Sequence, residues 1–272
     1  MATYVVTGVS KGIGYGALTV LTEDPANTVI GLVRDKAATV NKAAADPEFK
    51  GRSNYHILET DLTSYDALKT AAAEVAKITG GAIDYLIANA GYVSLFDNFD
   101  GIGTLAEQPK ELQDDLQKSF DVNVVGQIHL FNIFLPLILK GKTKKVISVT
   151  TAFADLDFTN AFDIENAPLY SISKAAMNLA VSKFSAQYKK DGVLFLSVCP
   201  GSVDVDRYKN TPPEQLQKLG GLMSKLMQYK PDFSGPVTPQ DSVRDMKAVW
   251  EKATAEKDGG AFLSQYGNKQ WL

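Results

Sequence analysis

The sequence is poor in the residues that build disulfides and metal sites. It has one cysteine, Cys199, and two histidines, His56 and His129, among 272 residues. A single cysteine excludes an internal disulfide, and these three residues are too few to ligate zinc in the usual way. We therefore expect no bound metal, and a reducing compartment such as the cytoplasm.

A strong charge of one sign is also missing. The chain has 28 Lys and Arg residues against 31 Asp and Glu, a formal net charge of −3, and these charges are interspersed. Nucleic acids and anionic membrane surfaces attract clustered positive charge, so neither is expected as a partner. The longest apolar stretch, from Val124 to Leu139, is interrupted by polar residues, and the first residues do not resemble a signal peptide. Secretion and membrane spanning are therefore not expected.

What the sequence does contain is a regular alternation of short apolar runs with longer stretches of helical period. Such alternation predicts parallel strands connected by helices. The expected strands cover residues 4–7, 28–33, 55–59, 85–88, 145–150, 193–198 and 261–264. The expected helices cover residues 14–22, 64–79, 112–139, 170–188 and 240–252. The predicted fold is a doubly wound, seven-stranded parallel α/β sheet of Rossmann type with helices on both faces.

No linker, repeat or low-complexity tract divides the chain. We therefore expect a single dinucleotide-binding catalytic domain over residues 1–272. Residues 202–235 differ from the rest because they contain repeated prolines and glycines and only weak helical pieces. We predict that this segment is mobile and covers a substrate site.

The first predicted strand runs into the sequence Thr7-Gly8-Val9-Ser10-Lys11-Gly12-Ile13-Gly14, and a helix follows. In a parallel sheet, this first turn between strand and helix is where a dinucleotide binds. Gly8 allows the tight turn, Gly12 lets the backbone approach the pyrophosphate, and Gly14 permits close packing of helix on strand. The turn therefore predicts a dinucleotide site that also includes Ser10, Lys11 and Ile13. The alternative is a glycine-rich connection without a ligand.

The spacing of this turn resembles that of the short-chain dehydrogenase/reductase family, and further landmarks of that family follow in order. They are Asp61-Leu62, Asn89-Ala90-Gly91, Asn123, the Tyr-x-x-x-Lys motif of Tyr170 and Lys174, and Pro200-Gly201 with Val203. Together they span most of the chain, and the ending from Gly259 to Trp271 is similar to that of fungal carbonyl reductases. The resemblance implies that these residues bind a nicotinamide cofactor or catalyse its reaction.

The end of the second predicted strand bears on which nicotinamide cofactor binds. NAD-binding relatives place a carboxylate there for the ribose 2′-hydroxyl, whereas this sequence has Val33 followed by Arg34. Arg34 and Lys11 can hold a 2′-phosphate instead, which predicts NADP(H). Two alternatives stay open: both cations are solvated surface residues, or Asp35 pairs with Arg34 or accepts from a ribose hydroxyl.

Tyr170 and Lys174 supply the predicted chemistry. Their four-residue spacing places both on one face of a helix, where the ammonium lowers the pKa of the phenol. Tyr170 then protonates the alkoxide that forms as hydride arrives from the nicotinamide. The resemblance further implies that Lys174 holds the nicotinamide ribose and that Asn123 keeps a water that links Lys174 to solvent. The alternative for Tyr170 is a buried tyrosine that caps a core helix.

Two positions depart from the family pattern. Thr151 stands where the family has a serine that bonds the substrate carbonyl, and threonine keeps the donor while its methyl group crowds the pocket. If the alignment shifts by one residue, Thr150 takes this role. Val205 stands where a threonine is expected, so one contact to the nicotinamide carboxamide is left unassigned.

The sequence thus predicts an NADPH-dependent carbonyl reductase that acts on a carbonyl or alcohol group of a small to medium, mostly apolar molecule. The alternatives are an NADP(H)-binding sensor or scaffold with little turnover, and an imine reductase or non-redox enzyme that uses the altered Thr151 site. Apolar residues are expected to line the substrate cleft, or else to pack their loops onto the domain: Phe153, Leu156, Phe158, Phe162 and Ile164, with Tyr208, Leu222, Met223, Leu226, Met227 and Tyr229.

The apolar face of the helix predicted over residues 112–139 has two interpretations. Its members include Phe120, Val124, Leu130 and Phe134. Helices in this position often contact a partner subunit in the family, which implies a homodimer or homotetramer. Packing against the sheet explains most of the same face equally well.

Overall fold

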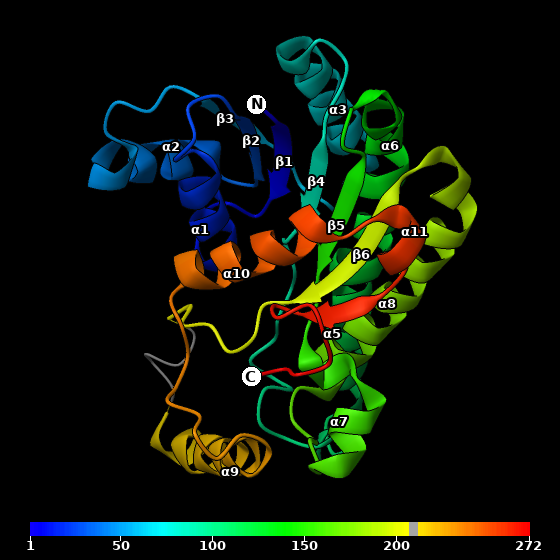
Figure 1. Ribbon diagram of the computed structural model, residues 1–272. Coiled ribbons are helices and arrows are strands. Elements are labelled where there is room, and N and C mark those ends of the chain that lie inside the picture. Colours follow the sequence, from blue (N-terminus) through cyan, green and yellow to red (C-terminus); the bar gives the residue numbers. More distant parts are fainter. Residues whose placement is uncertain (207–211) are drawn as a thin grey trace.

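The described residues, 1–206 and 212–272, form one parallel sheet with helices on both faces in the computed structural model (Figure 1). The order across the sheet is β3-β2-β1-β4-β5-β6-β7, and neighbouring strands are parallel. The strands are β1 (Thr3–Thr7), β2 (Thr28–Val33), β3 (Tyr55–Glu59), β4 (Tyr85–Ala88), β5 (Lys145–Val149), β6 (Leu194–Cys199) and β7 (Phe262–Ser264). The predicted doubly wound, seven-stranded Rossmann-type sheet is confirmed.

The helices connect the strands in sequence order. They are α1 (Gly12–Leu21), α2 (Lys36–Ala45), α3 (Tyr65–Thr79), α4 (Ile102–Leu105), α5 (Pro109–Phe120), α6 (Gly126–Lys140), α7 (Leu156–Ala161), α8 (Pro168–Tyr188), α9 (Pro213–Tyr229), α10 (Pro239–Lys252) and α11 (Ala255–Asp258). Short 3₁₀ turns lie at Pro47–Phe49, Ala152–Ala154 and Lys189–Asp191, and a π-helix turn at Asp121–Val125 joins α5 to α6.

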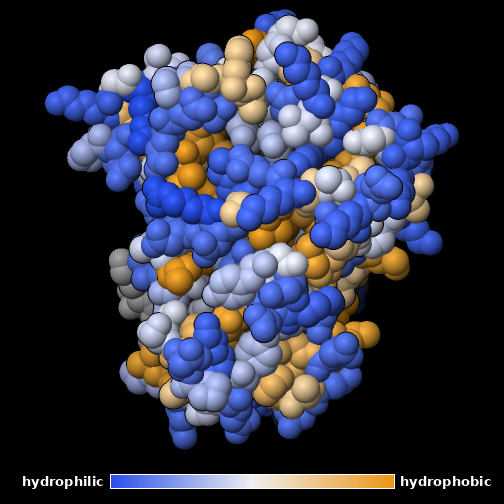
Figure 2. Space-filling view, in the orientation of Figure 1, coloured by the Kyte–Doolittle hydropathy of each residue, from blue (hydrophilic) through white to orange (hydrophobic). Residues whose placement is uncertain are grey.

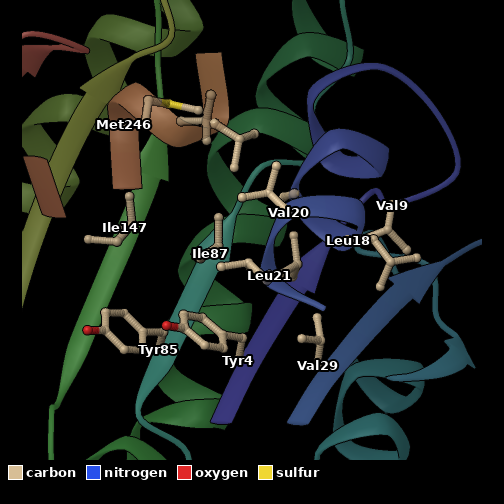
Figure 3. Packing of buried hydrophobic residues seen from close by; sticks show 14 of the residues in the cluster. Tyr4, Val9, Leu18, Val20, Leu21, Val29, Tyr85, Ile87, Ile147 and Met246 are labelled. Atoms are coloured by element: carbon tan, nitrogen blue, oxygen red, sulfur yellow. The ribbon is translucent and has the colours of Figure 1, made fainter. Parts of the chain in front are cut away.

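Each face of the sheet carries its own hydrophobic core because successive strand residues point to opposite faces. In β1, Tyr4 and Val6 belong to the core that α1 and α10 cover, whereas Val5 belongs to the core that α3, α6 and α8 cover. In the first core the rings of Tyr4 and Tyr85 lie side by side with centroids 4.6 Å apart (Figure 3). Burial on both faces explains why the strands are apolar throughout.

A third hydrophobic cluster lies beyond the carboxyl ends of the strands. It joins the stretch after β5, helix α9 and the C-terminal residues, with Ala152, Phe158, Ile164, Cys199, Leu222, Leu226 and Trp271 as its buried members. In Figure 1, α7 and α9 lie at this end of the molecule, on either side of the C-terminus. Apolar and polar residues are mixed on the surface there (Figure 2). We call this group the carboxyl-end cluster.

The segment 202–235 contains one continuous helix where the sequence predicts only weak helical pieces. In α9, Leu222, Leu226 and Tyr229 recur at helical spacing and face the carboxyl-end cluster. This tertiary burial stabilises a helix whose intrinsic propensity is weakened by two adjacent glycines. The mobility of the segment stays a prediction, and Tyr208 lies outside the described residues.

The helix predicted over residues 112–139 is confirmed as part of one helical stretch, Pro109–Lys140, in which a π-helix turn separates α5 from α6. The combined stretch from Pro109 to Lys140 is long and apolar enough to cross a membrane by length and composition alone. Within it, however, Leu130 and Phe134 are fully buried in the core that also includes α3 and α8. For these two residues the packing interpretation describes the observed environment, and contact of the helix with a partner subunit stays a prediction.

Candidate active site

The turn between β1 and α1 is packed so tightly that its key positions admit only glycine. Gly8 has φ +75°, and a Cβ atom there would lie 2.9 Å from Ala90. A Cβ atom on Gly14 would lie 2.2 Å from the carbonyl oxygen of Gly8 and 2.5 Å from Nδ2 of Asn89. The glycine turn therefore rests directly on the Asn89-Ala90-Gly91 turn that follows β4.

The start of α1 is open to an anionic ligand. Its N-cap residue, Lys11, makes no side-chain cap hydrogen bond within the described chain, and the first turn carries no acidic residue. By contrast, Asp35 and Ser64 cap α2 and α3 by accepting from the backbone N–H groups of Ala38 and Ala67. Uncapped N–H groups at the positive end of a helix suit a pyrophosphate. The residues present therefore fit a dinucleotide cofactor.

Several cations lie in the glycine turn or on the α2 side of it, among them Lys11, Arg34 and Lys42. Lys11 lies in the turn, and Arg34 follows β2; both side chains are exposed. Lys42 of α2 donates from Nζ to the carbonyl oxygen of Ser10 at 3.2 Å, and its Nζ lies 3.8 Å from the ring centre of Tyr15. Sequence reasoning missed Lys42 because it predicted no helix over residues 36–45. The only local signal was the alanine-rich composition of that stretch.

Two of the predicted cofactor residues use their side chains within the protein. The Asp61 carboxylate accepts from the backbone N–H and the Oγ1 of Thr63 at 2.8 and 2.7 Å. These hydrogen bonds, and the nearby charge of Arg34, lower the pKa of Asp61. Asn89 donates from Nδ2 to the carbonyl oxygen of Thr7 at 3.0 Å and so ties β4 to β1. Contacts between these two residues and a cofactor stay predictions.

The other predicted cofactor residues also lie where strands end. Gly12 and Ile13 begin α1, and Leu62 lies in the loop that follows β3. Ala90 and Gly91 follow β4, and Pro200, Gly201 and Val203 follow β6. The topology thus gathers at one edge of the sheet the landmarks that the sequence separates by almost 200 residues.

The stretch after β6 lies opposite the glycine turn. A Cβ atom on Gly12 would lie 3.1 Å from Cγ1 of Val205, so these two residues face each other. A parallel bridge between Val203 and Val237 closes the base of the segment that carries α9. The chain therefore leaves the sheet beside the predicted pyrophosphate position and returns to it after α9.

Tyr170 and Lys174 lie in the first two turns of α8 and are close in space. The Nζ of Lys174 lies 5.8 Å from the ring centre of Tyr170 and donates to the carbonyl oxygen of Val149 at 2.7 Å. A Cβ atom on Gly91 would lie 3.6 Å from the same Nζ. Burial lowers the pKa of Lys174 to about 8, so its ammonium form still dominates at neutral pH. The structure thus brings the predicted pair to the ends of β4 and β5.

Of the two candidate threonines, Thr151 is the more accessible. Thr150 is buried, and its Oγ1 has no hydrogen-bond partner in the part of the chain that the structure describes. Thr151 is half-buried and begins the 3₁₀ turn that packs against α8. Its Oγ1 accepts from the backbone N–H of Phe153 at 3.3 Å, which leaves the hydroxyl proton free to be donated.

Asn123 is fully buried in the π-helix turn, and its amide is used within the protein. Oδ1 accepts from the backbone N–H of Tyr92 at 2.7 Å, and Nδ2 donates to the Tyr92 carbonyl at 2.8 Å and to Oγ of Ser173 at 3.0 Å. Both amide hydrogens of Asn123 are therefore used within the protein, and the water of the predicted relay stays a prediction. A π-helix turn departs from the regular α-helical hydrogen-bond ladder and is common at functional sites.

Sequence reasoning missed Tyr92, whose backbone Asn123 holds at both ends. Its hydroxyl donates to Oδ1 of the buried Asp115 on α5 at 2.7 Å, and the Nζ of Lys118 lies 4.4 Å from its ring centre. Tyr92 directly follows the Asn89-Ala90-Gly91 turn, and this position was the signal available. Its orientation depends on α5, which no local pattern around Tyr92 shows.

Several of the aromatic residues expected at a substrate cleft instead pack against one another. Phe158 is only 4% exposed, and its ring centre lies 5.5 Å from that of Phe162 and 4.9 Å from that of Tyr229 on α9. Ile164 is also buried, whereas Leu156 is 75% exposed on the outer surface. For Phe158 and Ile164 the packing interpretation therefore describes the observed environment.

Comparison with known proteins agrees with this geometry. The sequence matches the family model described as short chain dehydrogenase over residues 2–216. It is 55% identical over 273 residues to the short chain dehydrogenase virK of Hypocrea virens and 54% identical over 274 residues to the short-chain dehydrogenase/reductase iacC of Pestalotiopsis fici. Each alignment covers 100% of both chains.

Solved structures share the fold. The NADPH-bound carbonyl reductase from chicken fatty liver superposes with a TM-score of 0.76 at 23% identity over 98% of both chains. The carbonyl reductase Sniffer of D. melanogaster gives a TM-score of 0.74, also at 23% identity, over 98% of both chains. Together with the family match and the full-length relatives, these findings establish that the chain belongs to the short-chain dehydrogenase/reductase family of nicotinamide-dependent oxidoreductases.

Proposed function

We propose that this protein is an NADPH-dependent reductase of a carbonyl group on a small to medium, mostly apolar organic molecule. One observation carries the proposal. Lys174 lies close to the Tyr170 ring and reaches the ends of β4 and β5, where the turn after β4 packs on the glycine turn. A proton donor, a cation that acts on it and a dinucleotide cradle therefore meet at one place.

NADPH, when bound, supplies the hydride that the carbonyl carbon accepts. Thr151 donates a hydrogen bond to the carbonyl oxygen and so stabilises the negative charge that develops there. Tyr170 gives its phenolic proton to the same oxygen, and Lys174 favours the resulting phenolate by its positive charge. The Tyr92 backbone, held by Asn123, keeps the turn after β4 in place beside this pair.

The preference for NADPH over NADH rests on charge. Arg34, Lys11 and Lys42 are available to a 2′-phosphate on the outer side of the glycine turn. Asp35 accepts from the Ala38 N–H at 2.8 Å to cap α2, so one of its two carboxylate oxygens is already used within the protein. The NADPH-bound state of the chicken carbonyl reductase is consistent with this preference.

For the substrate, the partly buried apolar residues of the carboxyl-end cluster, which begins directly after Thr151, favour a bulky, cyclic or aromatic carbonyl compound. Phe153, Phe162 and Met223 are only partly buried where they pack on the carboxyl-end cluster, so part of each side chain is available to a ligand. Assembly as a homodimer or homotetramer and a cytoplasmic location accompany the proposal as predictions.

The test is NADPH oxidation by the purified protein with a panel of carbonyl compounds. We expect aryl or bicyclic ketones to give a higher kcat/KM than acetaldehyde, and NADPH to be preferred to NADH. Cyclic imines belong in the same panel, because turnover of imines alone would favour the imine reductase alternative. Tight binding of NADPH without turnover of any compound would favour the sensor alternative.

A further inference from the structure

Helix α8, which carries Tyr170 and Lys174, begins without a cap of its own. Its N-cap residue is Ala167, which has no side-chain acceptor and adopts the left-handed conformation at φ 50° and ψ 50°. The start of the helix is nevertheless buried, with Ala167 4% exposed and Leu169 fully buried. Buried backbone N–H groups need an acceptor, so one must come from elsewhere in the chain.

The acceptor is Asp97, from the loop between β4 and α4. Its Oδ2 accepts from the backbone N–H groups of Leu169 at 2.9 Å and Tyr170 at 3.0 Å. Its own carbonyl oxygen accepts from the Ala167 N–H at 3.0 Å. Asp97 is fully buried, so this carboxylate does its capping away from solvent, where such charge-assisted bonds are strong.

A second tie joins the same two segments. Asn166 is buried and donates from Nδ2 to the carbonyl oxygen of Phe99 at 3.2 Å. Residues 97–99 therefore hold residues 166–170 from one side, while the bond from Lys174 to Val149 holds the next turn of α8 from β5. Tyr170 lies between these two attachments, at the third residue of the helix.

We propose that Asp97 is a positioning residue that fixes the backbone of Tyr170, so that the phenol reaches the substrate oxygen at the correct place. The inference rests on the proposed role of Tyr170 as proton donor. Without the Oδ2 acceptor the first turn of α8 frays, and the reactive group belongs to that turn. Displacing a catalytic group by about 1 Å lowers turnover by up to about 100-fold while cofactor binding at the glycine turn is unchanged.

The experiment compares Asp97→Ala with Asp97→Asn under conditions in which both are folded. The asparagine keeps an oxygen that can accept both N–H groups, whereas alanine removes it. We expect Asp97→Ala to lower kcat by about 10- to 100-fold with the Kd for NADPH within about 3-fold of wild type, and Asp97→Asn to restore most of kcat. If Asp97→Ala does not fold, Asp97→Gln displaces the acceptor by one methylene and is expected to lower kcat as well.

A matched control is Thr238→Ala, which removes the side-chain cap of α10 and carries no proposed site role. It should lower thermal stability and leave kcat unchanged. A wild-type kcat in Asp97→Ala, or in Asp97→Gln where that is the variant used, would overturn the positioning role. Tyr170→Phe is measured alongside: if it turns over like wild type, the proposed function fails, whereas if it alone is inactive, only the inference about Asp97 fails.

Discussion

The glycine turn and the carboxyl-end cluster lie at the same edge of the sheet but are built in opposite ways. The turn is set by residues 7–14 and by backbone atoms, and it leaves the first N–H groups of α1 open. The cluster is assembled from residues 152–164, α9 and the C-terminus, and its aromatic side chains largely close on one another. The predicted cofactor site thus depends on local backbone geometry, whereas the surface proposed for the substrate depends on packing between segments that are distant in the sequence.

The C-terminal residues show how the carboxyl-end cluster is held together by contacts between distant segments of the chain. Trp271 is 2% exposed and stacks on Phe262 of β7 with ring centres 4.6 Å apart. Its backbone N–H donates to the hydroxyl of Tyr229 on α9 at 2.9 Å, and Lys269 pairs with Asp155 at 2.8 Å. The last residues of the chain therefore tie α9 to the stretch after β5. We expect a substitution in one of these three segments to alter the packing of the other two.

The largest expected effect is that of Tyr170→Phe, because it acts where the two regions meet. Removing the hydroxyl removes the proposed general acid, and we expect kcat to fall by about 10² to 10⁴. The Kd for NADPH should stay near the wild-type value, because the glycine turn is untouched. Steady-state kinetics and cofactor titration measure the two quantities.

The exposed Tyr266 offers a control of the same chemistry, and Tyr266→Phe should leave both quantities unchanged. Wild-type turnover in Tyr170→Phe would assign the proton donor to another group. A parallel loss of NADPH binding would show that the two regions are not separable.

The next effect in size concerns the carboxyl-end cluster. Phe158→Ala empties a buried position between Phe162 and Tyr229, and we expect the free energy of unfolding to fall by about 3 kcal/mol. Leu156→Ala, in the same helix at a 75% exposed position, should change it by less than about 0.5 kcal/mol. Denaturant titration gives both values. Weakened NADPH binding in a folded Phe158→Ala variant would contradict the separation of the two regions.

The third prediction concerns the buried Lys174, which lies between the glycine turn and the carboxyl-end cluster. Because burial lowers the pKa of Lys174 to about 8 from its ordinary value of 10.5, the unfolded chain holds this proton between these pH values and the folded chain does not. Unfolding then takes up a proton, so the contribution of Lys174 to the free energy of unfolding rises with pH in this window and is constant below it. We expect the difference between wild type and Lys174→Met to grow by about 2 kcal/mol from pH 8 to pH 10.

Denaturant titrations of the cofactor-free protein at several pH values provide this difference. Taking it between the two proteins cancels the titration of the surface lysines and tyrosines that they share. A difference that is flat with pH would mean that water reaches the ammonium before the cofactor binds.

The smallest expected effect concerns the cations near the glycine turn. Lys42→Ala should reduce the preference for NADPH over NADH by about 3- to 10-fold, roughly 1 kcal/mol, and Arg34→Ala should reduce it by more, because the guanidinium binds phosphate with two N–H groups. Lys36→Ala, at an exposed lysine of the same helix, is the matched control. If Lys36→Ala and Lys42→Ala have the same effect, Lys42 acts only through overall charge.

The two regions also differ in how far the sequence predicts them. The strands β2, β3 and β4 have the predicted bounds, because apolar runs flanked by polar residues are a local signal. The position of the glycine turn after β1 and the closeness of Tyr170 and Lys174 on one helix also agree with the prediction, because both depend on residues close in the sequence. At the same edge of the sheet Lys42 and Tyr92 were missed, because their contacts depend on α2 and α5.

Other features could not be predicted, because they depend on contacts between residues that are far apart in the sequence. Asp97 and Tyr170 are 73 positions apart, and nothing around either residue shows that one caps the other. The stability of α9 depends on burial against Phe158, and the isolated sequence of α9, with Gly220 and Gly221, gives only a weak helical signal. The π-helix turn escaped notice because a pattern of period 3.6 does not show a single extra residue.

The extra residue of the π-helix turn determines how α5 is rotated about the helix axis relative to α6. An α-helix advances about 100° per residue, so removing one residue from Asp121–Val125 would turn α5 by about that angle relative to α6. On α5, Asp115 accepts from the Tyr92 hydroxyl; on α6, Gln127 donates from Nε2 to the Ala90 carbonyl at 2.7 Å. After such a rotation these two side chains would no longer both reach the loop after β4. The π-helix turn therefore fixes the rotation of α5 relative to α6, and this rotation lets both helices contact the same loop after β4.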